Sequence, residues 1–374
     1  MAKPHQRASD GLWAVTIELP VRLDGKRRRK TVYSKTRAGA ITKARAVQKE
    51  VDRAGDMLTT SPTLARWLER WLVEIAAPNV RPRTLENYAH MVTLITPPIG
   101  RIQVDKLGAE HVRRLASYVI DDRGLSPTTA HNAHAVLRKS LNDAMAEQVT
   151  SRNIAAIVKG PQKAHYEAKY LTAEQGETLL RSVATDPRAM IRWSLALIMG
   201  MRQGECLGLR ADHVDLDAGT IRVEWQLQRL EVAPRRGVKS EALGNDYHLT
   251  EPKTGAGARL LPMPAAVLEM MRRYVPKLAP DGFVCGPGIT DERTDARAWK
   301  RALLAADLPE VRLHSARHTA LTMLAKMGAP SHVREAIAGH ASQAALKMYT
   351  HSDQDEMRKW LDESSGLLLP GGEA

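Results

Sequence analysis

Six polar side chains in the second half of this 374-residue chain could together cleave a phosphodiester bond without a metal ion. Cleavage needs cations on the non-bridging oxygens of the phosphate, a proton donor for the departing oxygen, and a nucleophile that keeps the bond energy in a covalent intermediate. Arginine, lysine, histidine and tyrosine meet these needs. The candidates are Arg202, Lys253, His314, Arg317, His340 and Tyr349.

The first two candidates lie on predicted turns. Arg202 follows an apolar helix predicted over Pro187–Met199, and the glycines on either side of it indicate a tight turn, with Glu205 as an orienting partner. Lys253 lies at the tip of a hairpin predicted over His248–Pro262, from which a loop could deliver it as a mobile acid. Taken singly, an ordinary capped turn and a solvent-exposed lysine also explain these two residues.

The other four candidates lie on or beside predicted helices. His314 and Arg317 are three residues apart at the start of a helix, so both side chains point to one face where an anion is favoured. His340 follows a helix predicted over Val333–Ala338, and Tyr349 comes nine residues later. A lone tyrosine of this kind usually packs, but cations beside a phosphate would make a phenol with a reference pKa of about 10 a usable nucleophile.

The charge distribution indicates an N-terminal region that binds a polyanion, joined to an enzyme. The formal net charge is +13, and 9 of these charges lie in residues 1–53, whereas residues 165–374 carry 27 basic and 27 acidic side chains. Two cysteines are too few for a disulfide framework or a four-ligand zinc site, so we expect no metal site. Without an apolar leader or a long apolar run, the sequence predicts a cytoplasmic protein that does not bind a membrane.

The N-terminal residues 1–56 form the first of the predicted domains. Apolar residues alternate over Gly11–Leu19, which predicts a half-buried strand, and a turn, a basic return strand and a helix follow. A β-ribbon that binds DNA is one interpretation of the basic face, and a solvated charge run is the other. The candidate DNA-binding residues are Arg27, Arg28, Arg29 and Lys30.

The rest of the chain is predicted to form two further domains, so the fold class is multidomain. Residues 61–152 read as an all-α domain, with a tryptophan and leucine stripe as its core and a helix that begins at Ser126-Pro127. A linker is predicted over 153–169. Residues 170–352 read as a mixed α+β domain, with a capping box at Thr172 and a long strand over Thr220–Val232.

The six candidates, in this order, resemble the tyrosine recombinases, also called the phage integrase family. The resemblance covers residues 165–351 and includes His314-x-x-Arg317 and Gly339-His340, although the usual Leu-Gly-His reads Ala338-Gly339-His340 here. It extends to the lambda-type integrases of temperate actinobacterial phages. It implies that residues 61–152 are a core-binding domain and residues 1–56 an arm-binding domain.

The resemblance also implies a mechanism. Tyr349 would attack the scissile phosphate to give a 3′-phosphotyrosine, while Arg202 and Arg317 clamp the non-bridging oxygens. Lys253 would protonate the 5′-oxygen, and His314 would help to accept the tyrosine proton. His340 would hydrogen-bond the phosphate, and Glu205 would support the site from behind.

The function implied is a site-specific integrase that joins phage or mobile-element DNA to a bacterial chromosome through a Holliday junction, and excises it with a directionality factor. The implied partners are double-stranded DNA with core-type and arm-type sites, three more copies in a homotetramer, a host DNA-bending factor and an excisionase; no cofactor is implied. A resolvase-like recombinase or type IB topoisomerase, and a non-catalytic DNA-binding regulator, are the alternatives. The C-terminal tail, residues 353–374, would pack either on its own domain or on a neighbouring protomer.

Overall fold

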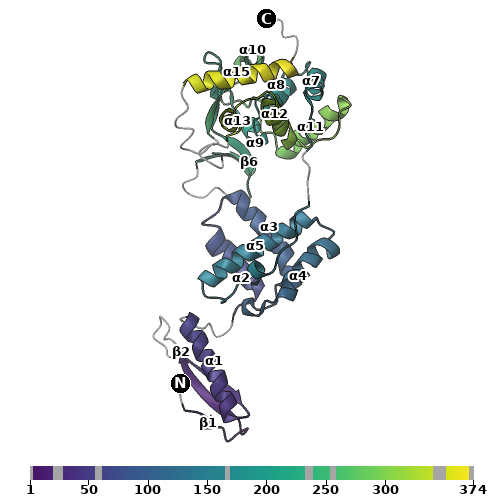
Figure 1. The fold of residues 1–374 in the computed structure, drawn as a ribbon. Helices are drawn as coiled ribbons and strands as arrows, with labels where there is room; N and C mark the ends of the chain where they lie inside the picture. The colour runs from purple at the N-terminus through teal and green to yellow at the C-terminus, as the bar shows by residue number, and fades with distance from the viewer. Residues whose placement is uncertain are drawn as a thin grey trace. The chain divides into compact units, whose positions relative to one another are not determined.

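The chain divides into two compact units, residues 1–165 and residues 166–374 (Figure 1). The computed structural model describes residues 3–19, 28–54, 61–164, 169–231, 239–252, 258–339 and 351–369. No helix in these ranges is both long and apolar enough to cross a membrane.

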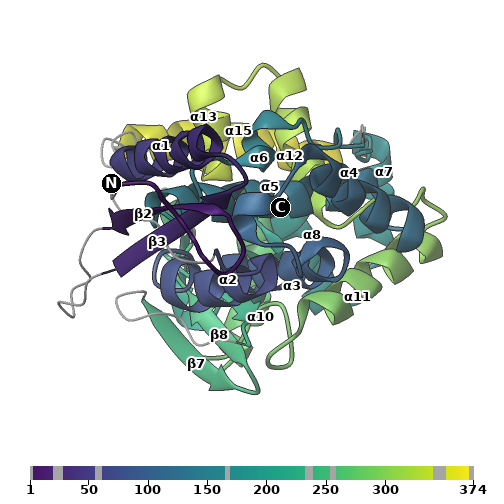
Figure 2. The ribbon, with the colours of Figure 1, turned by 90° about the horizontal axis from the view of Figure 1, so that it is seen from below.

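The first unit begins with a three-stranded antiparallel sheet that one helix covers. The strands β1 (His5–Gln6), β2 (Trp13–Leu19) and β3 (Arg28–Ser34) lie in that order, and α1 (Arg37–Ala54) packs against β2 and β3 (Figure 2). The alternation along β2 places every second side chain toward the helix, as the sequence predicts. The buried core consists of Val15, Ile17, Ala40 and Ala44.

The basic segment that is predicted to bind DNA lies at the start of β3. Arg28, Arg29 and Lys30 belong to this strand, whereas Arg27 and the predicted turn before it fall outside the described residues. Arg29 forms a 3.4 Å ion pair with Glu18 on β2, and both side chains are more than half exposed. Such a pair is weak because water screens it, so the Arg29 charge stays available at the surface.

Helices make up the regular structure of the first unit from residue 61 onward. They are α2 (Leu64–Arg70), η1 (Trp71–Ala76), α3 (Pro82–Ile99), η2 (Val104–Lys106), α4 (Ala109–Ser117), η3 (Tyr118–Asp122), α5 (Pro127–Ala146) and α6 (Ile154–Ile157). The predicted tryptophan stripe is buried. The indole of Trp67 donates to the carbonyl oxygen of Ser140 at 3.2 Å, and that of Trp71 donates to Asp143 at 2.7 Å, so both anchor α5.

The first half of the predicted linker, residues 153–169, packs on the helical part of the first unit. It begins with α6, whose Ile154 lies in the core of that part. The segment after α6 is bonded to α5: His134 contacts the carbonyl oxygen of Val158 at 3.1 Å, and His131 contacts that of Pro161 at 2.9 Å. The described connection therefore follows α5 instead of extending freely.

The second unit mixes helices with two small antiparallel sheets. One sheet has the order β4-β5-β9 and the other the order β6-β8-β7. The strands are β4 (Val214–Asp215), β5 (Thr220–Val223), β6 (Gln226–Arg229), β7 (Ser240–Gly244), β8 (Tyr247–Thr250) and β9 (Arg259–Pro262). The helices are α7 (Ala173–Ser182), α8 (Pro187–Leu197), α9 (Gln203–Leu207), η4 (Ala211–His213), α10 (Ala265–Tyr274), η6 (Val275–Lys277), α11 (Glu292–Ala305), α12 (His314–Lys326), α13 (Ser331–Ala338) and α15 (His351–Leu368).

Two strand predictions for this unit are wrong. The predicted strand Thr220–Val232 is two strands, β5 and β6, which belong to different sheets. The predicted hairpin His248–Pro262 does not form either, because β8 pairs with β6 and β7 whereas β9 pairs with β5. A hairpin does form between β7 and β8, whose turn at Asn245 and Asp246 has the positive φ angles that suit these residues.

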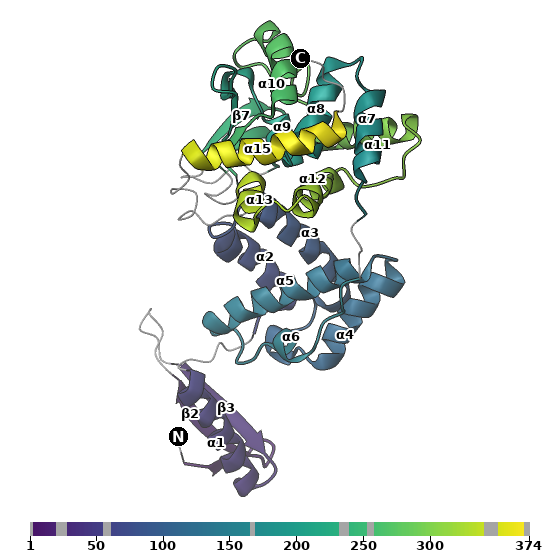
Figure 3. The same ribbon diagram turned by 45° about the horizontal axis from the view of Figure 1, so that its top comes forward.

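The C-terminal helix α15 packs on its own unit, next to α7, α12 and α13 (Figure 3). As far as residue 369, the described tail contacts its own unit. Leu368 is buried in the main core, and Arg358 donates to the carbonyl oxygen of Met263 at 2.8 Å. Asp362 accepts from the backbone N–H of Ala265 at 2.7 Å, at the start of α10.

Replacing Leu368 by alanine should lower the free energy of unfolding by about 2–5 kcal/mol, because the change removes buried apolar contacts and leaves a cavity. Urea denaturation of the full chain, followed by circular dichroism, measures this loss. The adjacent Leu367 is the matched control, since it is 46% exposed whereas Leu368 is 1% exposed. Leu367→Ala should change the free energy by no more than about 0.5 kcal/mol. Equal losses in the two variants would contradict the packing of α15 on its own unit.

Candidate active site

The structure brings four of the predicted site residues together in the second unit. Arg202 and Glu205 lie at the start of α9, and His314 and Arg317 lie on the first turn of α12. The other three candidates, Lys253, His340 and Tyr349, fall outside the described residues.

A short turn after α8 presents Arg202. Gly200 has a φ angle of +61°, which reverses the chain before Arg202 becomes the N-cap residue of α9. The Glu205 carboxylate accepts from the backbone N–H of Arg202 at 3.0 Å and from its guanidinium at 2.7 Å. The same three-residue spacing thus caps the helix and directs the side chain of Arg202, which is 32% exposed.

Sequence reasoning missed a further arginine, Arg259 on β9, which lies behind Glu205. Its two terminal nitrogens donate to the two oxygens of Glu205 at 3.1 and 2.9 Å, and its side chain is 2% exposed. The one sequence signal is that Arg259 occupies the same face of the strand as buried Leu261. The expected hairpin paired this strand with the wrong partner and so did not connect Arg259 with Glu205.

Arg317 is buried between the turn after α8 and the end of α13. One terminal nitrogen donates to the carbonyl oxygen of Gly200 at 2.6 Å, and the other donates to that of Ala338. Its position one turn into α12 lets it reach both segments. Arg317 therefore fixes the path of the chain on both sides of the cluster.

The charges of the cluster strongly affect each other. Burial favours the protonated form of Glu205, but Arg259 and Arg202 outweigh this effect and lower its pKa to about 2. Burial, and then the like charges of Arg202 and Arg259, lower the pKa of Arg317 to about 9. At neutral pH three guanidinium groups therefore surround one carboxylate, and this excess of positive charge attracts an anion.

His314 lies at the surface side of this cluster. Its ring packs edge-on to that of His318, with 5.1 Å between the centroids. Partial burial, followed by the charges of His318, Arg317 and Arg202, lowers the pKa of His314 below its ordinary value. The imidazole is therefore neutral at pH 7 and can accept a proton.

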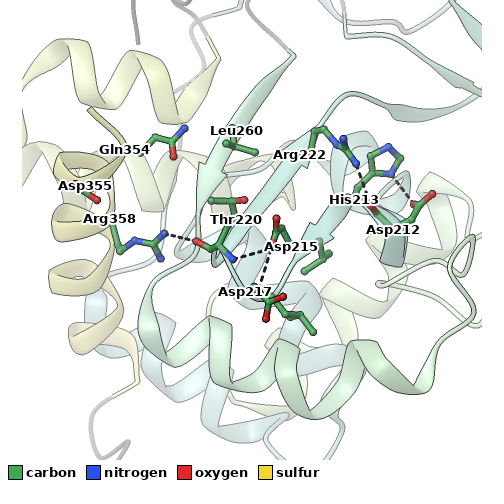
Figure 4. Close-up of a pocket in the computed structure, with 13 residues that line it drawn as sticks. Asp212, His213, Asp215, Asp217, Thr220, Arg222, Leu260, Gln354, Asp355 and Arg358 are labelled. Carbon is green, nitrogen blue, oxygen red and sulfur yellow. Dashed lines mark hydrogen bonds and ion pairs between the residues drawn. The ribbon is translucent and has the colours of Figure 1, made fainter. Parts of the chain in front are cut away.

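A separate hollow of about 760 Å³ lies beside β5 and the start of α15 (Figure 4). None of the four described site residues lines it. Its carboxylates are unfavourable for a DNA phosphate, so the arginine cluster is the better anion site. The acidic side chains in its lining are Asp212, Asp215, Asp217 and Asp355.

The comparisons with known proteins show the family of this chain. The model of the phage integrase family matches residues 169–356. The chain belongs to the phage integrase family. An "Integrase" of Saccharopolyspora erythraea is 25% identical over 92% of this chain and 91% of its own length.

Two solved structures are similar in fold to this family member. The Tn1549 transposon integrase, in complex with a circular intermediate DNA, has a TM-score of 0.63 and 21% identity, over 81% of this chain and 99% of that chain. A lambda integrase tetramer bound to a Holliday junction has a TM-score of 0.56 and 16% identity, over 93% of this chain and 97% of that chain.

Glu205→Gln should destabilise the fold by about 3 kcal/mol at pH 7, since each unit of the drop in pKa from 4.5 to about 2 is worth about 1.4 kcal/mol. The folded-state pKa is the lower one, so this stability is present above pH 4.5 and is lost as the pH falls toward 2. Chemical denaturation of the wild-type protein and of Glu205→Gln between pH 2 and 8 measures the difference in unfolding free energy.

The control for this experiment is Glu269→Gln, which breaks an exposed pair with Arg273 and should cost less than about 0.5 kcal/mol. The difference in unfolding free energy between Glu205→Gln and the unmodified protein should depend on pH. A constant difference would contradict the conclusion that Arg202 and Arg259 lower the pKa of Glu205 in the folded protein.

Proposed function

We propose that this protein is a tyrosine-type site-specific DNA recombinase that integrates phage or mobile-element DNA. The observation that carries the proposal is the cluster of Arg202 and Arg317 beside His314, whose pKa is lowered by partial burial and nearby charges, in a chain of the phage integrase family. Two cations suit the non-bridging oxygens of one phosphodiester, whose negative charge rises in the transition state. The neutral imidazole suits the removal of a proton from a nucleophile.

The reaction we propose is a transesterification. The Tyr349 oxygen forms a bond to phosphorus as the bond to the 5′-oxygen breaks, which leaves a 3′-phosphotyrosine and a free 5′-hydroxyl. His314 accepts the tyrosine proton, and Lys253 gives a proton to the 5′-oxygen. Arg202, Arg317 and His340 bind the non-bridging oxygens. The 5′-hydroxyl of the partner strand then attacks the phosphotyrosine, so the number of phosphodiester bonds is conserved.

The proposal assigns a DNA contact to each remaining part of the chain. Residues 61–152 bind core-type sites next to the scissile phosphate, and residues 1–56 bind arm-type sites through the basic start of β3. Four copies exchange strands through a Holliday junction, which the solved tetramer of the lambda integrase supports. A host DNA-bending factor assists assembly, and an excisionase directs the reverse reaction. The protein acts at the nucleoid of the host cell.

A nicked duplex that carries the core site should trap the wild-type protein as a covalent adduct that survives SDS, because the cut strand diffuses away before religation. Tyr349→Phe should give no adduct, since its ring lacks the attacking oxygen. Electrophoresis of the labelled DNA measures the yield. Tyr170→Phe is the matched control, because it removes a phenol that is 43% exposed outside the cluster, and it should react normally. An adduct in Tyr349→Phe would overturn the nucleophile assignment.

Replacing Arg28, Arg29 and Lys30 by glutamine should weaken binding to arm-type DNA and flatten its salt dependence, by about 0.9 in the log–log slope for each phosphate that the protein no longer neutralises. Fluorescence anisotropy at several salt concentrations measures both effects. A charge-matched control replaces three exposed cations of α1, Arg37, Arg45 and Lys49. If both triple variants lose the same affinity, the effect reflects net charge and not a binding face on β3.

A further inference from the structure

Three arginines of the second unit converge on three successive carbonyl oxygens at the end of α13. Arg259 donates to the carbonyl oxygen of Ile337 at 3.0 Å, Arg317 to that of Ala338, and Arg202 to that of Gly339 at 3.4 Å. These carbonyls lie at the C-terminal end of the helix, which carries partial negative charge. The end of α13 therefore serves as a common anchor for guanidinium groups from β9, α12 and α9.

Arg259 differs from Arg202 in how its side chain is used. Its Nε binds the end of α13, and its two terminal nitrogens form a bidentate pair with Glu205, so all three nitrogens have partners inside the protein. Its side chain is 2% exposed, whereas that of Arg202 is 32% exposed. Arg259 therefore cannot reach a DNA phosphate, although it adds positive charge next to Arg202, which is partly exposed.

The orientation of Arg202 depends on this buried pair. Glu205 directs the guanidinium of Arg202, but α9 has only five residues, which is too short to hold a charged side chain by itself. The planar fork of Arg259 fixes both carboxylate oxygens at once, which a single point charge does not do. A displacement of about 1 Å in a group that contacts the transition state can cost about a hundredfold in rate.

We propose that Arg259 is a positioning residue for phosphoryl transfer: it holds Glu205, and through it Arg202, in register with the end of α13. This inference rests on the proposed recombinase function. Arg259 acts through Arg202, which in the proposed reaction binds the non-bridging oxygens. The loss of Arg259 should therefore weaken the stabilisation of negative charge on these oxygens. Loss of Arg259 should therefore matter most when the scissile phosphate is charged.

The test compares single-turnover cleavage by Arg259→Gln and wild type on two nicked core-site duplexes. One duplex has the natural phosphodiester, and the other has a neutral methylphosphonate at the scissile position. Arg259→Gln should cleave the phosphodiester about 10- to 100-fold more slowly at saturating DNA, with a dissociation constant within about threefold of wild type. On the methylphosphonate the deficit should shrink to a few-fold, because less charge needs stabilisation. Arg259→Lys keeps the positive charge but loses the bidentate geometry. Its cleavage rate on the phosphodiester should lie between those of wild type and Arg259→Gln.

A matched control separates positioning from general destabilisation. Arg192 forms a buried bidentate pair with Asp295 in the same unit, with distances of 3.0 and 2.7 Å. Arg192→Gln should lower thermal stability about as much as Arg259→Gln, yet the folded protein should cleave both duplexes at nearly the wild-type rate.

Three results would overturn the proposal: normal cleavage by Arg259→Gln, an equal deficit on both duplexes, or the same deficit in Arg192→Gln. A different result would refute the recombinase function itself, namely a wild-type protein that forms no Tyr349-dependent adduct. If wild type reacts and the Arg259 variants behave like it, only the positioning role fails.

Discussion

The second unit of this protein depends on one buried carboxylate that two guanidinium groups share. Glu205 binds Arg202 on one side and Arg259 on the other. Burying such charges costs desolvation energy that their attraction barely repays, so the pair is weak evidence for stability alone. It does define orientation, because it links the short helix α9 to strand β9 through interactions with little angular freedom. The exposed guanidinium of Arg202 is directed by groups that solvent does not reach.

Carbonyl oxygens at the end of α13 partly compensate the positive charges of the three neighbouring arginines. Without compensation, Arg202, Arg259 and Arg317 would repel each other, and this repulsion adds to burial in lowering the pKa of Arg317. Successive carbonyl oxygens at a helix terminus supply partial negative charge without adding a group that would repel a phosphate. The cluster therefore keeps an excess of positive charge, which favours the binding of an anion.

The C-terminal helix gives this cluster a stable support. Arg358 binds the carbonyl oxygens of Met263, Ala218 and Gly219, and Asp362 caps α10, so α15 connects the β4-β5-β9 sheet to the helices around the site. Since α12 and α13 also pack against α15, the segments that carry Arg317 and its carbonyl partner share one hydrophobic core. Rigid elements of this kind hold charged groups more closely than loops do.

Much of this arrangement could be predicted from local features. The alternation along β2 and the tryptophan stripe at Trp67 and Trp71 predicted a strand and a helical core correctly, because these patterns depend on spacing alone. The order of the candidate residue types indicated the family, and the glycines around Arg202 indicated a tight turn with Glu205 as an orienting partner. Each of these features lies within a short stretch of chain or in the order of residues along it.

Only the tertiary structure decided which distant segments pair. Four-residue strands such as β5 and β6 contain too little periodicity to specify a partner, so their assignment to different sheets depends on contacts far along the chain. Arg259 becomes significant only when folding buries it against Glu205, 54 positions away. The sequence by itself determined which chemical groups this protein has and their order. The tertiary structure decided which of these groups form ion pairs with each other, because burial and long-range contacts determine how strongly they interact.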